Sequence, residues 1–279
     1  MIKQILFVLL FLIVPISCVA QLRYPVVGTF QSKSAQGMAI YGDNAFLMND
    51  GGGCRQLDLR TGKLVRQFKL ACAPSNPHVN NACFGVEKAG ESECPVIYIS
   101  ECREGGFRCF VESIDSVPLL LQTIIAKTGD KTLRAINWVV DVNQKVMYVV
   151  TRIDKHLDSK GSVRNTIIKY RLPRLEEGAI VELSEKDTLE SFDVIFPNIL
   201  QGCKIKGRYM YIVTGLHQGQ SHRKDSQRAI QVVDLKKKRL LKTIDLTFLT
   251  TNEPEDMDFY KGKGFVYCGQ EGGIYEIKF

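Results

Sequence analysis

The feature that most constrains the fold of this chain is an irregular internal repeat. Residues 36–70 and 201–246 share one order of features: a Gln-Gly start, an apolar strand, a tight turn, a second strand, a loop, and two further strands. Self-similarity on this scale indicates one supersecondary unit that is used several times. The fold is therefore expected to consist of repeated small units, which also restricts where a functional site can lie.

Three further units align with these two by their first strands. The five units begin near Gln36, Asn81, Trp138, Gln201 and Glu255. In each unit a second run of β-branched and aromatic residues follows, as at 146–150 and 209–213, and this composition is typical of strands. Gly, Asn and Asp in the intervening turns supply the positive φ that tight hairpins need. The pattern contains no long amphipathic helix, so it predicts an all-β fold.

The two ends of the repeat array complement one another. The last unit lacks a fourth strand before Phe279, whereas residues 24–30 have the pattern of a strand that precedes the first unit. Pairing this N-terminal strand with the last unit would close a ring and remove exposed sheet edges. The predicted fold is a five-bladed β-propeller with four antiparallel strands in each blade and the N-terminal strand closing the last blade. A six-bladed ring, a β-sandwich and a helical mixed fold are the alternatives.

The first twenty residues have the pattern of a secretory signal peptide. Lys3 is followed by an almost wholly apolar stretch, 5–16, and by small residues at cleavage spacing before Gln21. As an alternative, Cys18 would be the lipid-anchored residue of a lipoprotein. We expect residues 21–279 to form one propeller domain that is exported to the periplasm, the cell surface or the medium. No other stretch is long and apolar enough to span a membrane.

The charge of the chain is mildly basic, at +7 over the full sequence. The densest basic run, 236–239, lies between two predicted strands, where a charged hairpin tip is the ordinary explanation. Because no basic helix or aromatic-basic platform accompanies it, nucleic acid is not expected as a partner. The protein is expected to be a monomer.

Eight cysteines follow the predicted cleavage site, and export to an oxidising compartment would permit disulfides. Cys102 and Cys109 flank the turn residues 104–106 and are the candidate pair, since they would face each other across a hairpin. Zinc is the competing interpretation, but the sequence has no CxxC pair and gives His78 no partner at zinc-like spacing. Free buried thiols are the alternative for the remaining cysteines.

Several short motifs resemble five-bladed propellers of the glutamine cyclotransferase type. They are the Gln-Gly first strands, the turns DLRTGK and VDLKKKR, and the Glu-Pro-Glu-Asp segment 253–256 that opens the last unit. This resemblance, spread over most of residues 21–279, implies the propeller fold. It also implies that Glu255 or Gln36 lies where that family has polar channel residues. That family's site looks rich in tryptophan, whereas this chain has one tryptophan.

A second group of propellers is also similar. The segment 78–80 (His-Val-Asn), followed by the predicted strand at 95–100, resembles secreted or phage-associated propellers grouped with teichoic-acid protein C and helveticin-type proteins. Both resemblances imply the fold far more firmly than any one activity, because a single fold hosts many functions.

The starts of the innermost strands of a propeller open on one face, around a central channel. The residues expected to ring this mouth are Gln36, Asn81, Asn137, Trp138, Gln201, Glu255 and Asp256. Amide groups both donate and accept hydrogen bonds, so they suit hydroxyl-rich or peptide ligands. Trp138 is expected either to stack on a flat ligand face or to pack between blades. No catalytic residue, metal site or cofactor is predicted.

This set of residues favours a binding protein over an enzyme. The sequence has no GxSxG, no HExxH and no Gly-rich phosphate loop with a lysine. The leading hypothesis is a non-catalytic protein that binds a polar small molecule, glycan or peptide at the channel mouth. One alternative is a hydrolase, lyase or cyclotransferase-like enzyme acting on an envelope or extracellular polymer. The other is a scaffold for protein interactions.

Overall fold

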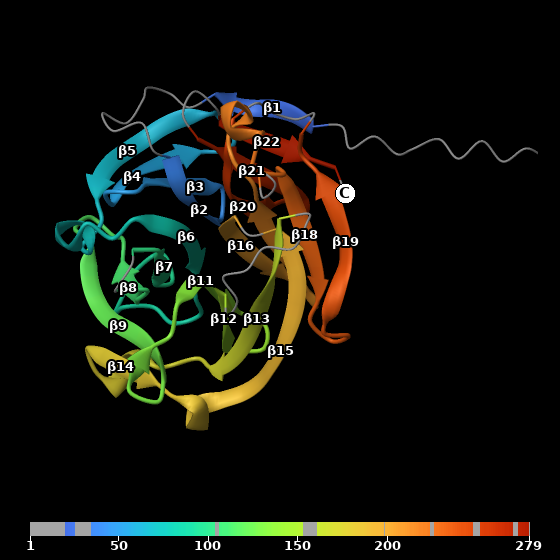
Figure 1. The fold of residues 1–279 in the computed structure, drawn as a ribbon. Coiled ribbons are helices and arrows are strands. Elements are labelled where there is room, and N and C mark those ends of the chain that lie inside the picture. The colour runs from blue at the N-terminus through green and yellow to red at the C-terminus, as the bar shows by residue number, and fades with distance from the viewer. Residues whose placement is uncertain are drawn as a thin grey trace, which may run out of the picture.

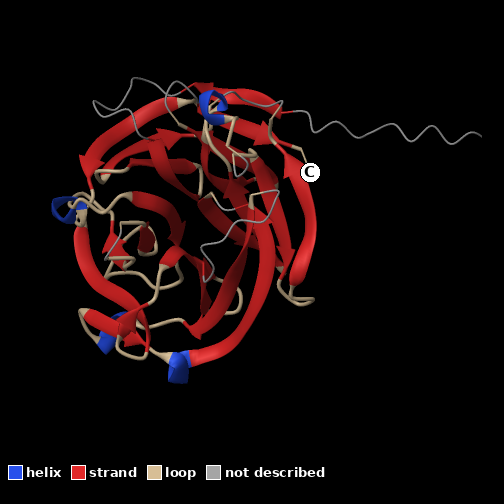
Figure 2. Ribbon diagram, in the orientation of Figure 1, coloured by secondary structure: helices blue, strands red, loops and turns tan. Residues whose placement is uncertain are grey.

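The structure is a computed structural model that describes residues 20–25, 35–103, 106–152, 161–197, 199–223, 226–247, 252–269 and 273–278. Five antiparallel sheets are arranged in a ring (Figure 1), so the predicted five-bladed β-propeller is confirmed. The helices among the described residues are single 3-10 turns at the periphery (Figure 2). Within the described part of the chain, no helix has the length and apolar character needed to cross a membrane.

Each blade is an up-and-down sheet, and the strands of each blade are given below from the innermost to the outermost (Figure 1). Blade 1 consists of β2 (Ala35–Tyr41), β3 (Asn44–Asn49), β4 (Gly53–Asp58) and β5 (Lys63–Lys69). Blade 2 consists of β6 (Val79–Phe84), β7 (Ile97–Glu101), β8 (Cys109–Ser113) and β9 (Leu119–Thr128). Blade 3 consists of β11 (Ala135–Asp141), β12 (Val146–Arg152), β13 (Ser162–Arg171) and β15 (Thr188–Pro197). Blade 4 consists of β16 (Leu200–Lys206), β17 (Tyr209–Thr214), β18 (Ala229–Asp234) and β19 (Arg239–Asp245). Blade 5 consists of β20 (Pro254–Tyr260), β21 (Lys263–Cys268), β22 (Gly273–Ile277) and β1 (Ala20–Pro25).

Blade 2 carries two additional strands at its outer edge. β10 (Lys131–Thr132) folds back on β9, and β14 (Ile180–Leu183) pairs with β9 in parallel. Because β14 comes from the connection between β13 and β15, it ties blade 3 to blade 2 and covers an otherwise open edge.

The N-terminal strand closes the ring, as the sequence predicted. β1 pairs antiparallel with β22, with Ala20 opposite Ile277 and Pro25 opposite Gly273. The strand begins earlier than expected, at Ala20 rather than at residue 24, and residues 26–30 lie outside the described part of the chain. The register shifts between Leu22 and Tyr24, so the pairing of β1 with β22 is irregular at Arg23. Its Arg23 bonds Glu276 of β22, with Nε to Oε2 at 2.7 Å.

Hydrophobic side chains fill the spaces between adjacent blades rather than one central core. Four clusters of buried residues lie at the junctions of blades 1 and 2, of blades 2, 3 and 4, of blades 4 and 5, and of blades 5 and 1. Burial of this apolar area is the dominant favourable contribution to folding. The axis itself is left to polar groups.

The expected disulfide between Cys102 and Cys109 is not formed, and all eight cysteines after Cys18 are free thiols. The register of the β7–β8 hairpin explains this result. Ser100 lies opposite Cys109, so Cys102 lies beyond the end of β7 and does not face the Cys109 thiol. A disulfide needs facing Cβ atoms a few ångströms apart.

The innermost strand of each blade has no neighbour on its axial side, so its N–H groups there need other partners. All five of these strands have a register shift near their first residues. The first or second residue after each shift donates its backbone N–H to a side chain near the axis. These residues are Met38, Ala82, Trp138, Cys203 and Met257.

Asp256 satisfies three of these five amides. Its Oδ2 accepts from Met38 N at 2.7 Å and from Ala82 N at 3.2 Å, and its Oδ1 accepts from Met257 N at 2.7 Å. One fully buried carboxylate therefore joins blades 5, 1 and 2. Gly202 is required beside it, because a Cβ at that position would lie 1.9 Å from Asp256 Oδ1.

Other side chains complete this arrangement, which we call the axial hub. Cys203 N donates to Asn81 Oδ1 at 2.9 Å, and Asn81 Nδ2 donates to Trp138 O at 2.7 Å. Below them Lys204 Nζ lies 2.6 Å from Asp258 Oδ2. Because Asn81 joins blade 2 to blade 4 and Asp256 joins blades 5, 1 and 2, the hub links the inner strands at this level. We call the end of the axis at which these strands begin the channel mouth.

Replacing Asp256 with alanine is expected to destabilise the protein strongly. Three buried N–H groups would lose their acceptor at a cost of about 1–3 kcal/mol each, so we expect the free energy of unfolding to fall by about 3 kcal/mol or more. Urea unfolding measures this change. The control Asp245→Ala removes an exposed carboxylate that accepts from Thr247 N, and we expect a change of at most about 1 kcal/mol. Equal stability of the two variants would contradict the role of the hub.

Candidate functional site

The floor of the channel mouth is formed by the residues at the register shifts. They are Gln36, Asn80, Ile136, Gln201 and Glu255. Gln36, Gln201 and Glu255, three of the residues named for the mouth from the sequence, occupy this position in blades 1, 4 and 5. In blade 2 the equivalent residue is Asn80 rather than Asn81, and in blade 3 it is Ile136 rather than Asn137 or Trp138.

Three other predicted mouth residues belong to the axial hub or border it. Asp256 and Asn81 are wholly buried in the hub, where they make the hydrogen bonds given in the description of the fold. Asn137, also wholly buried, donates from Nδ2 to Gln201 O at 2.5 Å and accepts at Oδ1 from Asn80 Nδ2. These amide hydrogen bonds link blades 2, 3 and 4, so the side chains of Asn80 and Asn137 already have hydrogen-bond partners within the protein.

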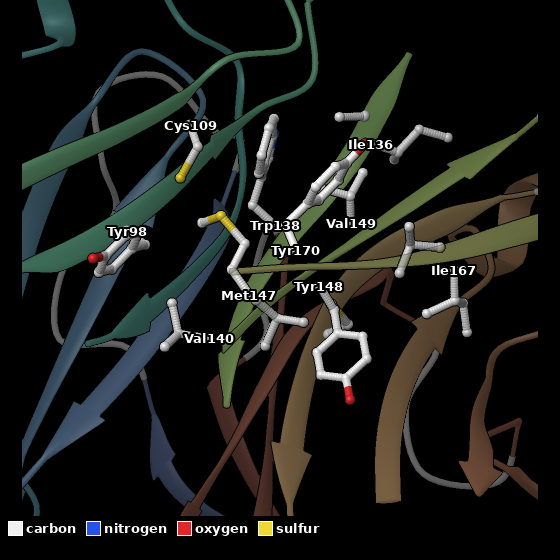
Figure 3. Packing of buried hydrophobic residues seen from close by; sticks show 14 of the residues in the cluster. Tyr98, Cys109, Ile136, Trp138, Val140, Met147, Tyr148, Val149, Ile167 and Tyr170 are labelled. Carbon is white, nitrogen blue, oxygen red and sulfur yellow. The ribbon is translucent and has the colours of Figure 1, made fainter. Parts of the chain in front are cut away.

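Trp138 lies in the core between blades. Its side chain has no exposed surface and packs near Cys109, Met147 and Tyr170 (Figure 3). Its indole Nε1 donates to Phe107 O at 3.3 Å. Of the two expectations for this residue, the structure matches packing between blades.

Glu255 is the mouth residue with the least satisfied side chain. It is 5 % exposed, and its Oε2 is buried without a hydrogen-bond partner among the described residues. Burial, together with the neighbouring carboxyl groups of Glu253 and Asp256, raises the pKa of Glu255 well above its usual range. A buried carboxyl without a donor is more stable in the protonated form, so Glu255 is expected to hold a proton at neutral pH.

Glu253 lies close enough to Glu255 for its charge to act on the Glu255 carboxyl group. Its Oε1 accepts from Gln201 Nε2 at 2.7 Å, and Gln201 Nε2 also donates to Gly215 O at 3.1 Å. Burial raises the pKa of Glu253, although Gln201, His217 and Arg223 partly oppose this effect. The two carboxyl groups and the Gln201 amide therefore form one polar cluster on blades 4 and 5, which we call the acidic pair site.

Two features shape the acidic pair site on its blade 5 and blade 1 side. Gly269 leaves room for Glu255, because a Cβ there would lie 2.5 Å from Glu255 Oε1. Burial raises the pKa of Tyr267, and the charge of Glu255 adds to this effect while Arg55 opposes it. The Tyr267 phenol and the buried Arg55 guanidinium are therefore close enough to affect the local electrostatics.

The β17–β18 loop borders the same site. It contains a 3-10 turn, η4 (Gln218–Gln220), and His217 Nδ1 accepts from Gly219 N at 3.0 Å. Arg228 is buried at its base and donates to Leu216 O, at 3.3 Å. Within the described residues no three His, Cys, Asp or Glu side chains are arranged to hold a metal ion. Residues 153–160, in the connection between β12 and β13, lie outside the described part of the chain.

Two further clefts lie away from the mouth floor. A cleft of about 580 Å³ between blades 1 and 2 is lined by Arg66, Ser92, Cys94 and Asp115 among others. A cleft of about 340 Å³ on blade 2 contains Glu101 and Arg108, which pair with Nε to Oε2 at 2.7 Å. In the first cleft Arg66 and Asp115 have hydrogen-bond partners within the protein, and in the second Glu101 and Arg108 bond each other. Glu255 Oε2, in contrast, has no partner among the described residues.

Sequence reasoning did not single out Asn80, Ile136, Tyr267 or Arg55 as mouth residues. A register shift inserts a residue that no periodicity announces, so the offsets in blades 2 and 3 had no sequence signal. Glu253 belongs to the Glu-Pro-Glu-Asp segment, but Pro254 makes the strand geometry on either side of it hard to predict from the sequence. The clearest signal was the Glu-Pro-Glu-Asp segment itself.

Comparisons with known proteins show the fold of the chain and no more than the fold. No protein-family model matches the chain, and no curated protein matches its sequence. Among solved structures, glutaminyl cyclase of Myxococcus xanthus is similar, with a TM-score of 0.54 and 14 % sequence identity. The match covers 95 % of this chain and 97 % of that chain. The predicted resemblance to propellers of the glutamine cyclotransferase type is thus confirmed for the fold.

Replacing Glu255 with glutamine is expected to stabilise the protein at neutral pH. A carboxyl whose pKa is raised in the folded state binds its proton more tightly there than when unfolded, so wild-type stability falls as pH rises above about 4.5. Glutamine lacks this titration. We expect Glu255→Gln to gain about 1 kcal/mol or more at pH 7, and the difference from wild type to vanish below pH 4.5. Thermal unfolding across this pH range measures the difference, and a pH-independent gap would contradict the raised pKa.

Proposed function

We propose that the protein is an exported receptor that binds a polar ligand at the channel mouth, with a peptide amino group or amide held by the acidic pair site. The observation that carries this proposal is the buried Glu255 oxygen that has no donor among the described residues. Leaving such an acceptor unpaired is unfavourable, and buried polar groups without partners are uncommon in native proteins. A ligand N–H group would supply the missing donor.

The chemistry of the site favours a donor-rich ligand. Glu253 and Glu255 supply acceptor oxygens, whereas the Gln201 amide N–H group is already bound to Gly215 O and Glu253. A protonated amine beside Glu255 favours loss of the Glu255 proton, because a nearby positive charge stabilises the carboxylate. The amine then gains charge-assisted hydrogen bonds from the carboxylates, which are about twice as strong as neutral ones. Peptides with a free N-terminus are therefore preferred over neutral glycans. Export itself rests on the apolar segment 5–16 and the cleavage pattern that follows it.

A binding screen tests this function directly. The purified protein is titrated with short peptides, with the same peptides acetylated at the N-terminus, and with neutral oligosaccharides. We expect the free-amine peptides to bind, and Gln201→Ala or Glu255→Gln to weaken them at least tenfold, which is about 1.4 kcal/mol. The matched control is Gln144→Ala, in an exposed turn at the opposite end of the propeller, and it should leave the affinity unchanged. A ligand whose affinity neither mouth change weakens would falsify the site.

An enzyme is the second candidate, and one observation favours it. A carboxyl with a raised pKa can donate and accept protons near neutral pH, as general acid–base catalysis requires. Together with the fold shared with a glutaminyl cyclase, this supports a cyclotransferase-like reaction on a peptide that begins with glutamine. The single tryptophan of this chain is buried in the core, and this makes binding without turnover the first choice.

Mass spectrometry distinguishes the two candidates. A peptide with an N-terminal glutamine is incubated with the protein, and cyclisation releases ammonia and lowers the peptide mass accordingly. If the first choice is correct, the peptide binds and its mass does not change faster than in buffer. Accelerated cyclisation that Glu255→Gln abolishes would establish the enzyme instead.

A further inference from the structure

Basic side chains gather at the end of the propeller opposite the mouth. This end, the basal face, is formed by the turns that join first to second strands and third to fourth strands. The exposed basic residues on its turns in blades 4, 5 and 1 form what we call the basic sector. They are Arg60, Lys63, Lys206, Arg208, Lys236, Lys237, Lys238, Arg239, Lys261, Lys263 and Lys278.

The acidic residues in these turns do not balance the sector. Asp58 and Asp43 face Arg60, Asp234 is bonded to Arg208 at 2.9 Å, and Glu276 is bonded to Lys263 at 2.8 Å. Each of these acids lies within reach of at least one cation, and most of the lysines of the 236–239 turn remain exposed to solvent. Two lysines are also paired, Lys238 with Glu190 and Lys261 with Asp43. The basic side chains still outnumber the acids, so the sector carries a net positive charge. Its three blades are consecutive in the ring (Figure 1).

The rest of the basal face has a different charge. On blade 2 its turns carry Glu87, Glu91, Glu93 and Asp115 against Lys88. The positive charge of the basal face is thus concentrated on blades 4, 5 and 1. It is centred on blade 5, between the turns of blades 4 and 1.

The chain enters the propeller at this same place. β1 starts with Ala20 opposite Ile277, and Ile277 lies opposite Gly264, next to the turn at Lys261. The N-terminal end of β1 is therefore at the basal face of blade 5. The apolar stretch 5–16 and Cys18 precede it directly in the sequence.

From these two placements we infer that the basal face docks on an anionic membrane surface, with blade 5 nearest the lipid headgroups and the mouth facing away. Basic side chains near a membrane are attracted to anionic headgroups, and the attraction falls off within about a Debye length. One lipid chain alone gives marginal membrane binding, whereas a chain combined with a basic patch gives stable binding. Both signals converge here in the lipoprotein alternative, because processing at Cys18 removes the stretch 5–16 and leaves a lipid chain two residues before β1, whose first residue, Ala20, is at the basal face of blade 5. The mouth and its acidic pair site stay accessible in this orientation.

Vesicle flotation tests this orientation. The protein, purified as its host cell processes it, is mixed with vesicles of phosphatidylcholine alone or of equal parts phosphatidylcholine and phosphatidylglycerol. We expect it to float with the anionic vesicles, not with the neutral ones, and to be released at high salt. The double variant Lys236→Glu, Lys237→Glu should lower partitioning at least tenfold, because each basic residue near the surface contributes about 1 kcal/mol.

The matched control reverses the same amount of charge at the other end of the molecule. Lys69 and Lys131 are exposed where β5 ends and β10 begins, on the mouth side. Lys69→Glu, Lys131→Glu should change partitioning by less than about twofold, since these residues lie beyond the range of the headgroup potential. Unfolding curves of both double variants exclude a folding defect. Lack of binding to anionic vesicles would overturn the inference, as would equal loss in the two variants. Binding to a soluble anionic polysaccharide such as alginate, without binding to vesicles, would overturn it as well.

Discussion

The structure depends on how the unpaired backbone N–H groups at the inner edges of the five sheets find hydrogen-bond acceptors. A ring of blades brings five strand edges to one axis, where no sixth strand can pair with them and where water is largely excluded. Asp256 resolves most of this problem, because its two oxygens accept backbone N–H groups from blades 1, 2 and 5. Asn81 and Ser100 accept the remaining two amides. Buried backbone donors are nearly always paired in native proteins, and here side chains replace the missing strand.

The hub also determines where a ligand site can lie. It links the inner strands across the axis, and the residues at the register shifts, just before the hub in each inner strand, lie at the mouth. The side-chain amides of Asn80 and Asn137 are hydrogen-bonded within the protein. The remaining polar residues at the register shifts are Gln36, Gln201 and Glu255, on blades 1, 4 and 5. Glu255 and Asp256 are neighbours in the sequence with different environments: Asp256 accepts three N–H groups, and Glu255 Oε2 accepts none among the described residues. Adjacent residues of a strand point in opposite directions, so one serves the fold and the other faces the mouth.

The sequence predicted the ring but not the fine placement of its residues. The matching patterns of 36–70 and 201–246 indicated the blades, and the complementary ends indicated closure by β1. The closing strand begins at Ala20, four residues earlier than expected, and so includes the last residue before the predicted cleavage site. Register shifts moved the mouth position to Asn80 and Ile136, because an inserted residue leaves no trace in a periodic pattern. The disulfide prediction was wrong for the same kind of reason: the register of β7 and β8 sets Ser100, not Cys102, opposite Cys109.

We conclude that Glu255 at the channel mouth is protonated at neutral pH and that its Oε2 has no hydrogen-bond donor among the described residues. Infrared difference spectroscopy of wild type against Glu255→Gln at neutral pH examines this group directly. The account predicts a C=O stretching band of a protonated carboxyl that is present in wild type, missing in the variant, and shifted or lost when a free-amine peptide saturates the site. A spectrum in which Glu255 contributes carboxylate bands at neutral pH, unchanged by such a peptide, would contradict it.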